Sequence, residues 1–145
     1  GMARTYSFEN SFKEIPMFWG EFNAQYAENL YHQIPEACIG MYGVCLEPVE
    51  GSNEFKYLIA GDYKGGKVPE GLEVVELPAY IWAKFKCVGP MPHTLQQLNQ
   101  RIYSEWVPNN PKYALAAGLN IEVYSMGDPS SETYESEIWV PVKEK

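Results

Sequence analysis

Two glutamates near the carboxyl end of the chain, Glu122 and Glu137, are the residues best suited to acid–base or charge-based chemistry. They lie in residues 119–125 and 136–142, where apolar and polar side chains alternate as they do in a half-buried β-strand. Two carboxylates close together would raise the pKa of one of them, as an acid–base pair requires. The same carboxylates beside aromatic rings could instead bind an organic cation. The residue types alone leave both interpretations open.

An aromatic side chain accompanies each glutamate on its strand face. The period of two along a strand places Tyr124 beside Glu122 and Trp139 beside Glu137. A symmetric hairpin centred on residues 130–131 would set Glu122 opposite Trp139, with both glutamates on one face and about 7–8 Å apart. Because an aromatic face attracts a cation by about 0.5–2 kcal/mol, this pattern favours binding of a flat organic cation. We expect Glu137 to be its main counter-ion and Glu122 to be the partner.

The strand predicted for residues 79–87 adds two more rings, because Tyr80 and Trp82 share its polar face. The opposite face of each of these three strands is aliphatic. Those aliphatic faces include Ile81, Ile121 and Ile138. We expect amphipathic helices to pack on this aliphatic side and the rings to lie on the uncovered side.

The elements around these strands repeat along the chain. Helical spacing of apolar residues predicts helices over residues 16–33 and 92–106, and each helix is followed by two strands. The strands predicted in the first half are residues 4–8, 38–46 and 54–61. We therefore predict a single α+β domain over residues 1–145, built from two pseudo-symmetric β-α-β-β units with antiparallel strands and with both helices packed on one side.

The composition argues against several common functions. A net charge of −8 repels nucleic acid and anionic lipid, and no apolar run approaches the roughly 20 residues that a membrane span needs. Three cysteines without CxxC spacing predict reduced thiols, and two histidines are too few for an ordinary zinc site. The amino-terminal residues lack the apolar core of a signal peptide. We expect a cytoplasmic protein without a metal or cofactor.

Nucleophilic catalysis would require a histidine within reach of a serine or cysteine. His32 and His93 lie at the ends of the predicted helices, where solvent-facing or capping roles are commoner. The glycines before Lys67 lack the spacing of a phosphate-binding loop. We assign no catalytic residue, and a small-molecule hydrolase that uses Glu137 or Glu122 remains the alternative.

Six short stretches, taken together and in order, resemble the GyrI-like superfamily, which includes the effector-binding domains of AraC-type transcription activators. The resemblance runs from about Phe12 to Lys143. The stretches are residues 15–19, 39–44, 77–80 with the following Phe85 and Gly89-Pro90, 102–108, 121–124 and 137–142.

The resemblance implies a cleft between two β-α-β-β halves that takes up amphipathic ligands, often lipophilic cations. It implies that the acidic pocket residue is Glu137 or Glu122. The pocket aromatics would be Tyr42, Tyr80, Trp82, Tyr124 and Trp139. No helix-turn-helix precedes the matching stretches, so we expect no direct DNA binding. We expect the partner to be a separate regulator protein or a second copy of the chain. Because some superfamily members are hydrolases and one branch inhibits DNA gyrase, those two functions stay as alternatives.

Overall fold

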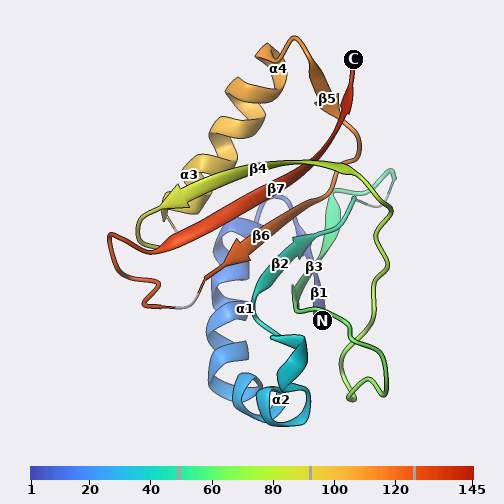
Figure 1. Cartoon of the computed structure of the whole chain (residues 1–145), viewed down its shortest axis with the longest axis vertical. Helices are drawn as coiled ribbons and strands as arrows, with labels where there is room; N and C mark the ends of the chain where they lie inside the picture. Colours follow the sequence, from blue (N-terminus) through green and yellow to red (C-terminus); the bar gives the residue numbers. More distant parts are fainter. Residues whose placement is uncertain (49, 92, 126) are drawn as a thin grey trace. The chain divides into compact units, whose positions relative to one another are not determined.

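One order of elements occurs twice along the chain: a strand, a helical segment, and then antiparallel strands (Figure 1). The computed structural model describes residues 1–48, 50–91, 93–125 and 127–145. The chain divides into two units, Gly1–Leu77 and Pro78–Lys145, and each unit contains one copy of this order. The predicted α+β class is therefore confirmed, and the β-α-β-β order recurs with one additional short strand, β5 (Tyr113–Leu115), in the second unit.

The first unit forms an antiparallel sheet in which β3 lies between β1 and β2. Its elements are β1 (Met2–Ser7), α1 (Ser11–Gln25), α2 (Ala27–Gln33), the 3-10 turn η1 (Pro35–Ala37), β2 (Tyr42–Cys45) and β3 (Glu54–Ala60). The single helix predicted for residues 16–33 starts earlier, at Ser11, and is interrupted at Tyr26.

The core of the first unit lies between β3 and α1. Phe55, Tyr57 and Ile59 alternate along β3 and so share one face, which packs against Phe18 and Phe22 of α1. The Tyr57 side chain is 0% exposed, and its hydroxyl accepts a 2.8 Å hydrogen bond from Trp19 Nε1. The helix is therefore held to the sheet by apolar packing and by the hydrogen bond between Trp19 and Tyr57.

The second unit contains an antiparallel sheet in the order β6-β7-β4, and β5 also pairs with β7. Its elements are β4 (Ile81–Val88), α3 (His93–Arg101), the π-helix η2 (Ile102–Trp106), α4 (Val107–Asn109), β5 (Tyr113–Leu115), β6 (Asn120–Tyr124) and β7 (Glu135–Glu144). Pro92, where the sequence predicted the helix to begin, lies outside the described residues. No helix among the described residues is long and apolar enough to cross a membrane.

The helical segment of the second unit covers one face of its sheet. Ile138 and Val140 of β7, each 0% exposed, pack with Cys87 of β4 against Leu95 and Ile102. The aliphatic faces of β4 and β7 thus lie on the helix side, as predicted. Two of the three isoleucines that we predicted to lie beneath the helices do not do so. Ile81 is 57% exposed at the start of β4, and Ile121 of β6 pairs with Trp139 on the opposite face of the sheet.

The register between β6 and β7 differs by one residue from the symmetric hairpin that we predicted. Glu122 pairs with Ile138, and Val123 pairs with Glu137. Because side chains alternate with a period of two, a shift of one residue exchanges the two faces of a strand. Glu122 therefore lies on the helix-covered side with Ile138, and the prediction that both glutamates share one face is wrong.

The connection between these strands explains the shift. Asp128 Oδ1 accepts a 2.9 Å bond from the Ser130 amide, and the Tyr134 amide bonds to the Ser131 carbonyl at 3.2 Å. The hydroxyl of the buried Tyr134 side chain donates a 2.9 Å hydrogen bond to the Ser125 carbonyl. Two successive turns and an anchored tyrosine replace the single symmetric turn that we assumed.

A close approach of two backbone segments makes glycine necessary at position 61. A Cβ at Gly61 would meet the Ala37 carbonyl oxygen and would lie 2.8 Å from the Cys38 carbonyl carbon. We expect Gly61→Ala to lower the free energy of unfolding by about 2 kcal/mol or more, because these backbone atoms cannot move aside cheaply. Urea unfolding followed by tryptophan fluorescence measures the change.

Gly20→Ala is the matched control, because a Cβ at this exposed position of α1 meets nothing within 4 Å. It should raise the free energy of unfolding by about 0.5–1 kcal/mol through helix propensity. Equal stability of the two variants would contradict the close approach at Gly61.

Candidate ligand-binding site

A row of three polar side chains occupies the helix-covered face of β6. Asn120, Glu122 and Tyr124 alternate along the strand and are all half-buried. The Tyr124 hydroxyl donates to Glu122 Oε1 at 3.1 Å, and Asn120 Nδ2 donates to the Tyr103 hydroxyl at 3.1 Å. The Tyr124 ring also packs on the apolar core of the unit. The structure therefore holds a carboxylate in a defined position among rings and amide groups.

The Tyr103 side chain that contacts this row comes from the π-helix η2.

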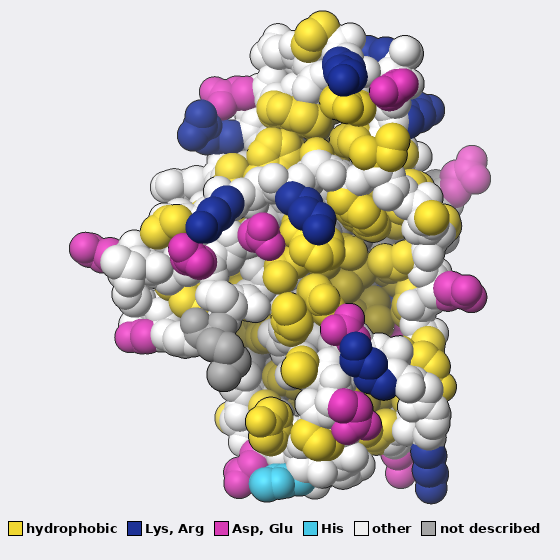
Figure 2. All heavy atoms as spheres, in the orientation of Figure 1, with side chains coloured by type: hydrophobic (Ala, Val, Ile, Leu, Met, Phe, Trp, Pro, Cys, Tyr) yellow, Lys and Arg dark blue, Asp and Glu magenta, His cyan; other side chains and the backbone are white. Residues whose placement is uncertain are grey.

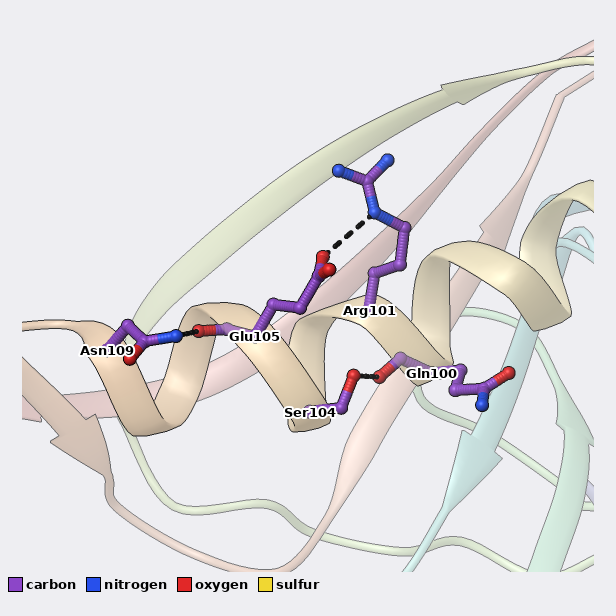
Figure 3. Close-up of polar contacts among 5 residues, drawn as sticks. All are labelled: Gln100, Arg101, Ser104, Glu105 and Asn109. Atoms are coloured by element: carbon purple, nitrogen blue, oxygen red, sulfur yellow. Dashed lines mark hydrogen bonds and ion pairs between the residues drawn. The ribbon is translucent and has the colours of Figure 1, made fainter.

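The outer side of the helical segment is polar, and its side chains contact one another (Figure 3). Arg101 Nε lies 3.0 Å from a Glu105 carboxylate oxygen, and Ser104 Oγ donates to the Gln100 carbonyl at 2.7 Å. The Asn109 side-chain amide donates to the Glu105 backbone carbonyl at 2.7 Å (Figure 3). Short π-helical segments occur frequently at functional sites, where the wide turn changes which side chains face inward.

The opposite face of the second unit carries the remaining rings. The Tyr80 and Trp82 ring centroids are 5.6 Å apart, and those of Trp82 and Trp139 are 6.4 Å apart. The Lys84 ammonium stands 4.0 Å from the Trp139 ring centroid. A protein cation therefore already lies over the ring that we predicted to receive the ligand.

Glu137 shares this face with lysines. It pairs across the strands with Lys86, which also forms a 3.1 Å ion pair with Glu135. Figure 2 shows basic and acidic side chains standing among hydrophobic ones over β4 and β7. Glu137 and Glu122 lie on opposite faces of the sheet, so they cannot bind the same ligand together.

Tyr42, the remaining predicted aromatic, belongs to the first unit. It lies half-buried on β2, on the sheet face opposite the core of α1 and β3. Burial raises the pKa of its phenol, and the nearby charge of Asp62 raises this pKa further. Its role in ligand binding remains a prediction.

Asn120 and Tyr103 were missed by the sequence analysis. Asn120 could have been found, because it alternates with Glu122 on the same strand face. Tyr103 could not, because its inward position depends on the π-helix. Within the described parts of the chain, no group of three or more His, Cys, Asp and Glu side chains is arranged to hold a metal ion.

The first unit contains an open cleft of about 730 Å³ between β1 and α1. It is lined by Arg4, Thr5, Tyr6, Glu14, Met17, Phe18, Glu21 and Gln25. Arg4 bonds to both carboxylate oxygens of Glu21, at 2.7 and 2.9 Å, and its guanidinium lies 4.3 Å from the Phe18 ring centroid. This hydrogen-bonded ion pair lowers the pKa of Glu21.

Residues 1–142 match the family model described as Cass2, integron-associated effector binding protein. The chain belongs to this family. The membership confirms the resemblance to effector-binding domains of the GyrI-like superfamily that the sequence suggested. No curated protein matches the chain.

Three solved structures are similar in fold. SAV2435 bound to tetraphenylphosphonium has a TM-score of 0.77 and 23% identity, over 99% of this chain and 86% of that one. A transcription-regulator-like protein from Staphylococcus aureus has a TM-score of 0.76 and 23% identity, over 99% of this chain and 90% of that one. An integron cassette protein from Vibrio cholerae has a TM-score of 0.67 and 16% identity, over 99% of this chain and 88% of that one.

The Arg4–Glu21 pair predicts how the stability of the protein changes with pH. Because the folded-state pKa of Glu21 is lowered, its stabilising effect is present above the ordinary carboxyl pKa of 4.5 and is lost as the pH falls through the folded-state pKa. We expect Glu21→Gln to lower the free energy of unfolding at neutral pH. The same change should make this free energy fall less as the pH is lowered. Urea unfolding at several pH values below and above 4.5 measures both effects.

Glu28→Gln, on the exposed surface of α2, is the control for loss of one carboxylate. It should leave the acid dependence close to that of the wild type. If Glu21→Gln unfolds in acid with the wild-type dependence, the ion pair does not contribute in solution.

Proposed function

We propose that this protein binds amphipathic organic cations with an aromatic body, and that Glu122 supplies the negative charge. The observation that carries the proposal is the half-buried Glu122 carboxylate, oriented by the Tyr124 hydroxyl at 3.1 Å on the helix-covered face of β6. A carboxylate partly removed from water attracts a cation more strongly than an exposed one does. The neighbouring phenol rings offer apolar surface and π-faces to the rest of the ligand.

Charge on the two faces favours Glu122 over Glu137. Glu137 lies opposite Lys86, and Lys84 covers the Trp139 ring on the same face. Both lysines would oppose the approach of a second cation. The neighbours of Glu122 on its own strand face, Asn120 and Tyr124, are uncharged. The predicted ring set of Tyr80, Trp82 and Trp139 remains the competing location for a ligand.

Two further observations support a cationic ligand. The net charge of −8 raises the local concentration of cations around the protein. A structure similar in fold, SAV2435, was solved with tetraphenylphosphonium, which is a lipophilic cation, and the family is described as effector-binding. We further propose that the protein acts in the cytoplasm without contacting DNA, and that a separate regulator protein or a second copy responds to the bound ligand.

The test is titration of the protein with tetraphenylphosphonium, followed by calorimetry or tryptophan fluorescence. Glu122→Gln should weaken binding by about tenfold or more, which corresponds to about 1.4 kcal/mol, because the counter-charge is lost while the side-chain shape is kept. Glu137→Gln is the matched control and should bind within about twofold of wild type. The neutral analogue triphenylphosphine oxide should bind more weakly and should be insensitive to both changes.

Loss of binding in Glu137→Gln, with wild-type affinity in Glu122→Gln, would assign the ligand to the face that carries Trp139. Equal affinity for the cation and its neutral analogue would contradict a cation site altogether. Chemical change of the ligand on mixing would instead favour the hydrolase alternative.

A further inference from the structure

We propose that the outer edge of β1 binds an extended segment of a partner protein as an additional strand, and that this segment carries basic and apolar side chains. The segment lies in the open cleft between β1 and α1 of the first unit. The proposal concerns a protein partner and does not depend on the Glu122 site, so the two can fail separately.

The first observation is that β1 is an edge strand, which pairs with β3 on one side and ends the sheet order. The same register continues past the strand, because the Phe8 amide donates to the Asn53 carbonyl at 3.0 Å. In an antiparallel pair, alternate residues direct both backbone groups toward the partner strand. The even-numbered residues of β1 therefore bond toward β3, and the odd-numbered residues direct their backbone groups outward.

The second observation is that this outer edge already accepts an extended segment at its first position. Gly1 and Glu73 exchange two backbone hydrogen bonds, of 2.7 and 2.9 Å, which is the pattern of an antiparallel pair. The segment then leaves the edge at a turn, in which the Leu72 amide bonds to the Pro69 carbonyl at 3.2 Å. The chain's own segment therefore stops before it reaches Ala3.

Ala3 and Thr5 are the positions that this segment leaves open. No described residue forms a hydrogen bond with the outward amide or carbonyl group of either one. Beyond them, the Ser7 carbonyl accepts the Asn10 amide at 3.3 Å, where the chain turns toward α1. Two donors and two acceptors thus stand in the pattern that a short antiparallel strand completes. Such main-chain bonds contribute affinity, and the side chains beside the edge determine which sequences bind.

The cleft beside this edge offers surfaces for those side chains. Thr5 lines it from β1, so the cleft reaches the outer edge of the strand. On the α1 side it is lined, one turn after another, by Glu14, Met17, Glu21 and Gln25. Met17 is 67% exposed and presents apolar surface to a bound side chain. Side chains on one face of an added strand recur about every 6–7 Å, so two or three of them meet this helical row.

The charges of the cleft favour a basic segment. Glu21 bonds to Arg4 through both carboxylate oxygens, whereas Glu14 is exposed and forms no ion pair among the described residues. The cleft therefore carries two carboxylates and one guanidinium, in a protein of net charge −8. A lysine or arginine next to an apolar residue on one strand face complements Glu14 and Met17. A second copy of the chain also carries a charge of −8 and complements this surface less well.

The test uses a blocked heptapeptide in which threonine alternates with lysine, valine and lysine, so that these last three side chains share one strand face. In calorimetric titration, the wild type should bind it at least about tenfold more tightly than the same peptide with glutamate in place of lysine. N-methylation of one alternate set of peptide residues should abolish binding, and N-methylation of the other set should not. The reason is that only one set directs its amides toward β1.

Thr5→Pro removes an outward amide and places a ring where the peptide must lie, so it should weaken binding by about tenfold or more. Proline is tolerated in an edge strand where its nitrogen faces solvent. Thr5→Val keeps the amide and is the matched control, which should bind within about twofold of wild type. Glu14→Lys leaves the edge intact and should shift the preference toward the glutamate peptide, which provides a second variant if circular dichroism shows that Thr5→Pro folds poorly.

Equal affinity for the two peptides, or wild-type affinity for the lysine peptide in Thr5→Pro, would overturn the proposal. A dimer in analytical ultracentrifugation that Thr5→Pro dissociates, without peptide binding, would assign the edge to a second copy and overturn it as well. Absence of peptide binding in a protein that still binds tetraphenylphosphonium through Glu122 would reject this proposal and leave the proposed function standing.

Discussion

The pairing of Glu122 with Ile138 across β6 and β7 decides which side chains of the second unit can meet a ligand together. Since strand side chains alternate, this one pairing places Glu122 on the helix-covered face and leaves Glu137 on the opposite face. The register is held by the turns after β6 and by the buried ring of Tyr134, whose hydroxyl bonds to the Ser125 carbonyl. The connecting segment therefore determines which side chains make up the candidate site.

The helical segment imposes the second constraint. Ile102 and Leu95 bury their side chains against β7, and this packing holds the segment over the strand face that carries Glu122. The π-helix then brings Tyr103 to Asn120 within the same five-residue stretch that contributes Ile102 to the core. Core packing and the contact that orients Asn120 are thus made by adjacent residues, and a change at Ile102 would disturb the orientation of Asn120 as well as the core.

Much of the fold could be predicted from the sequence, because strand alternation and helical spacing are local properties. Local alternation also placed Tyr124 on the same face as Glu122, and the hydrogen bond between them confirms that part of the prediction. The relation of β6 to β7 could not be obtained in this way. It depends on two turns and on a tyrosine that bonds nine residues back along the chain, and a symmetric hairpin ignores both. The preference for Glu137 rested partly on that assumed register, which placed it opposite Tyr124, and partly on Trp139, two residues away on the same strand face.

The two faces of the second unit therefore differ in how their charges are balanced. On the face with Trp139, Lys84 lies over the Trp139 ring. Lys86 forms an ion pair with Glu135 and pairs across the strands with Glu137, so cations of the protein itself already lie beside this ring and these carboxylates. On the face with Glu122, the carboxylate is oriented by a neutral phenol, and its strand neighbours carry no charge. A neutral hydrogen bond orients a carboxylate without cancelling its charge. This difference in surroundings is the reason why we propose Glu122, and not Glu137, as the counter-ion of the ligand.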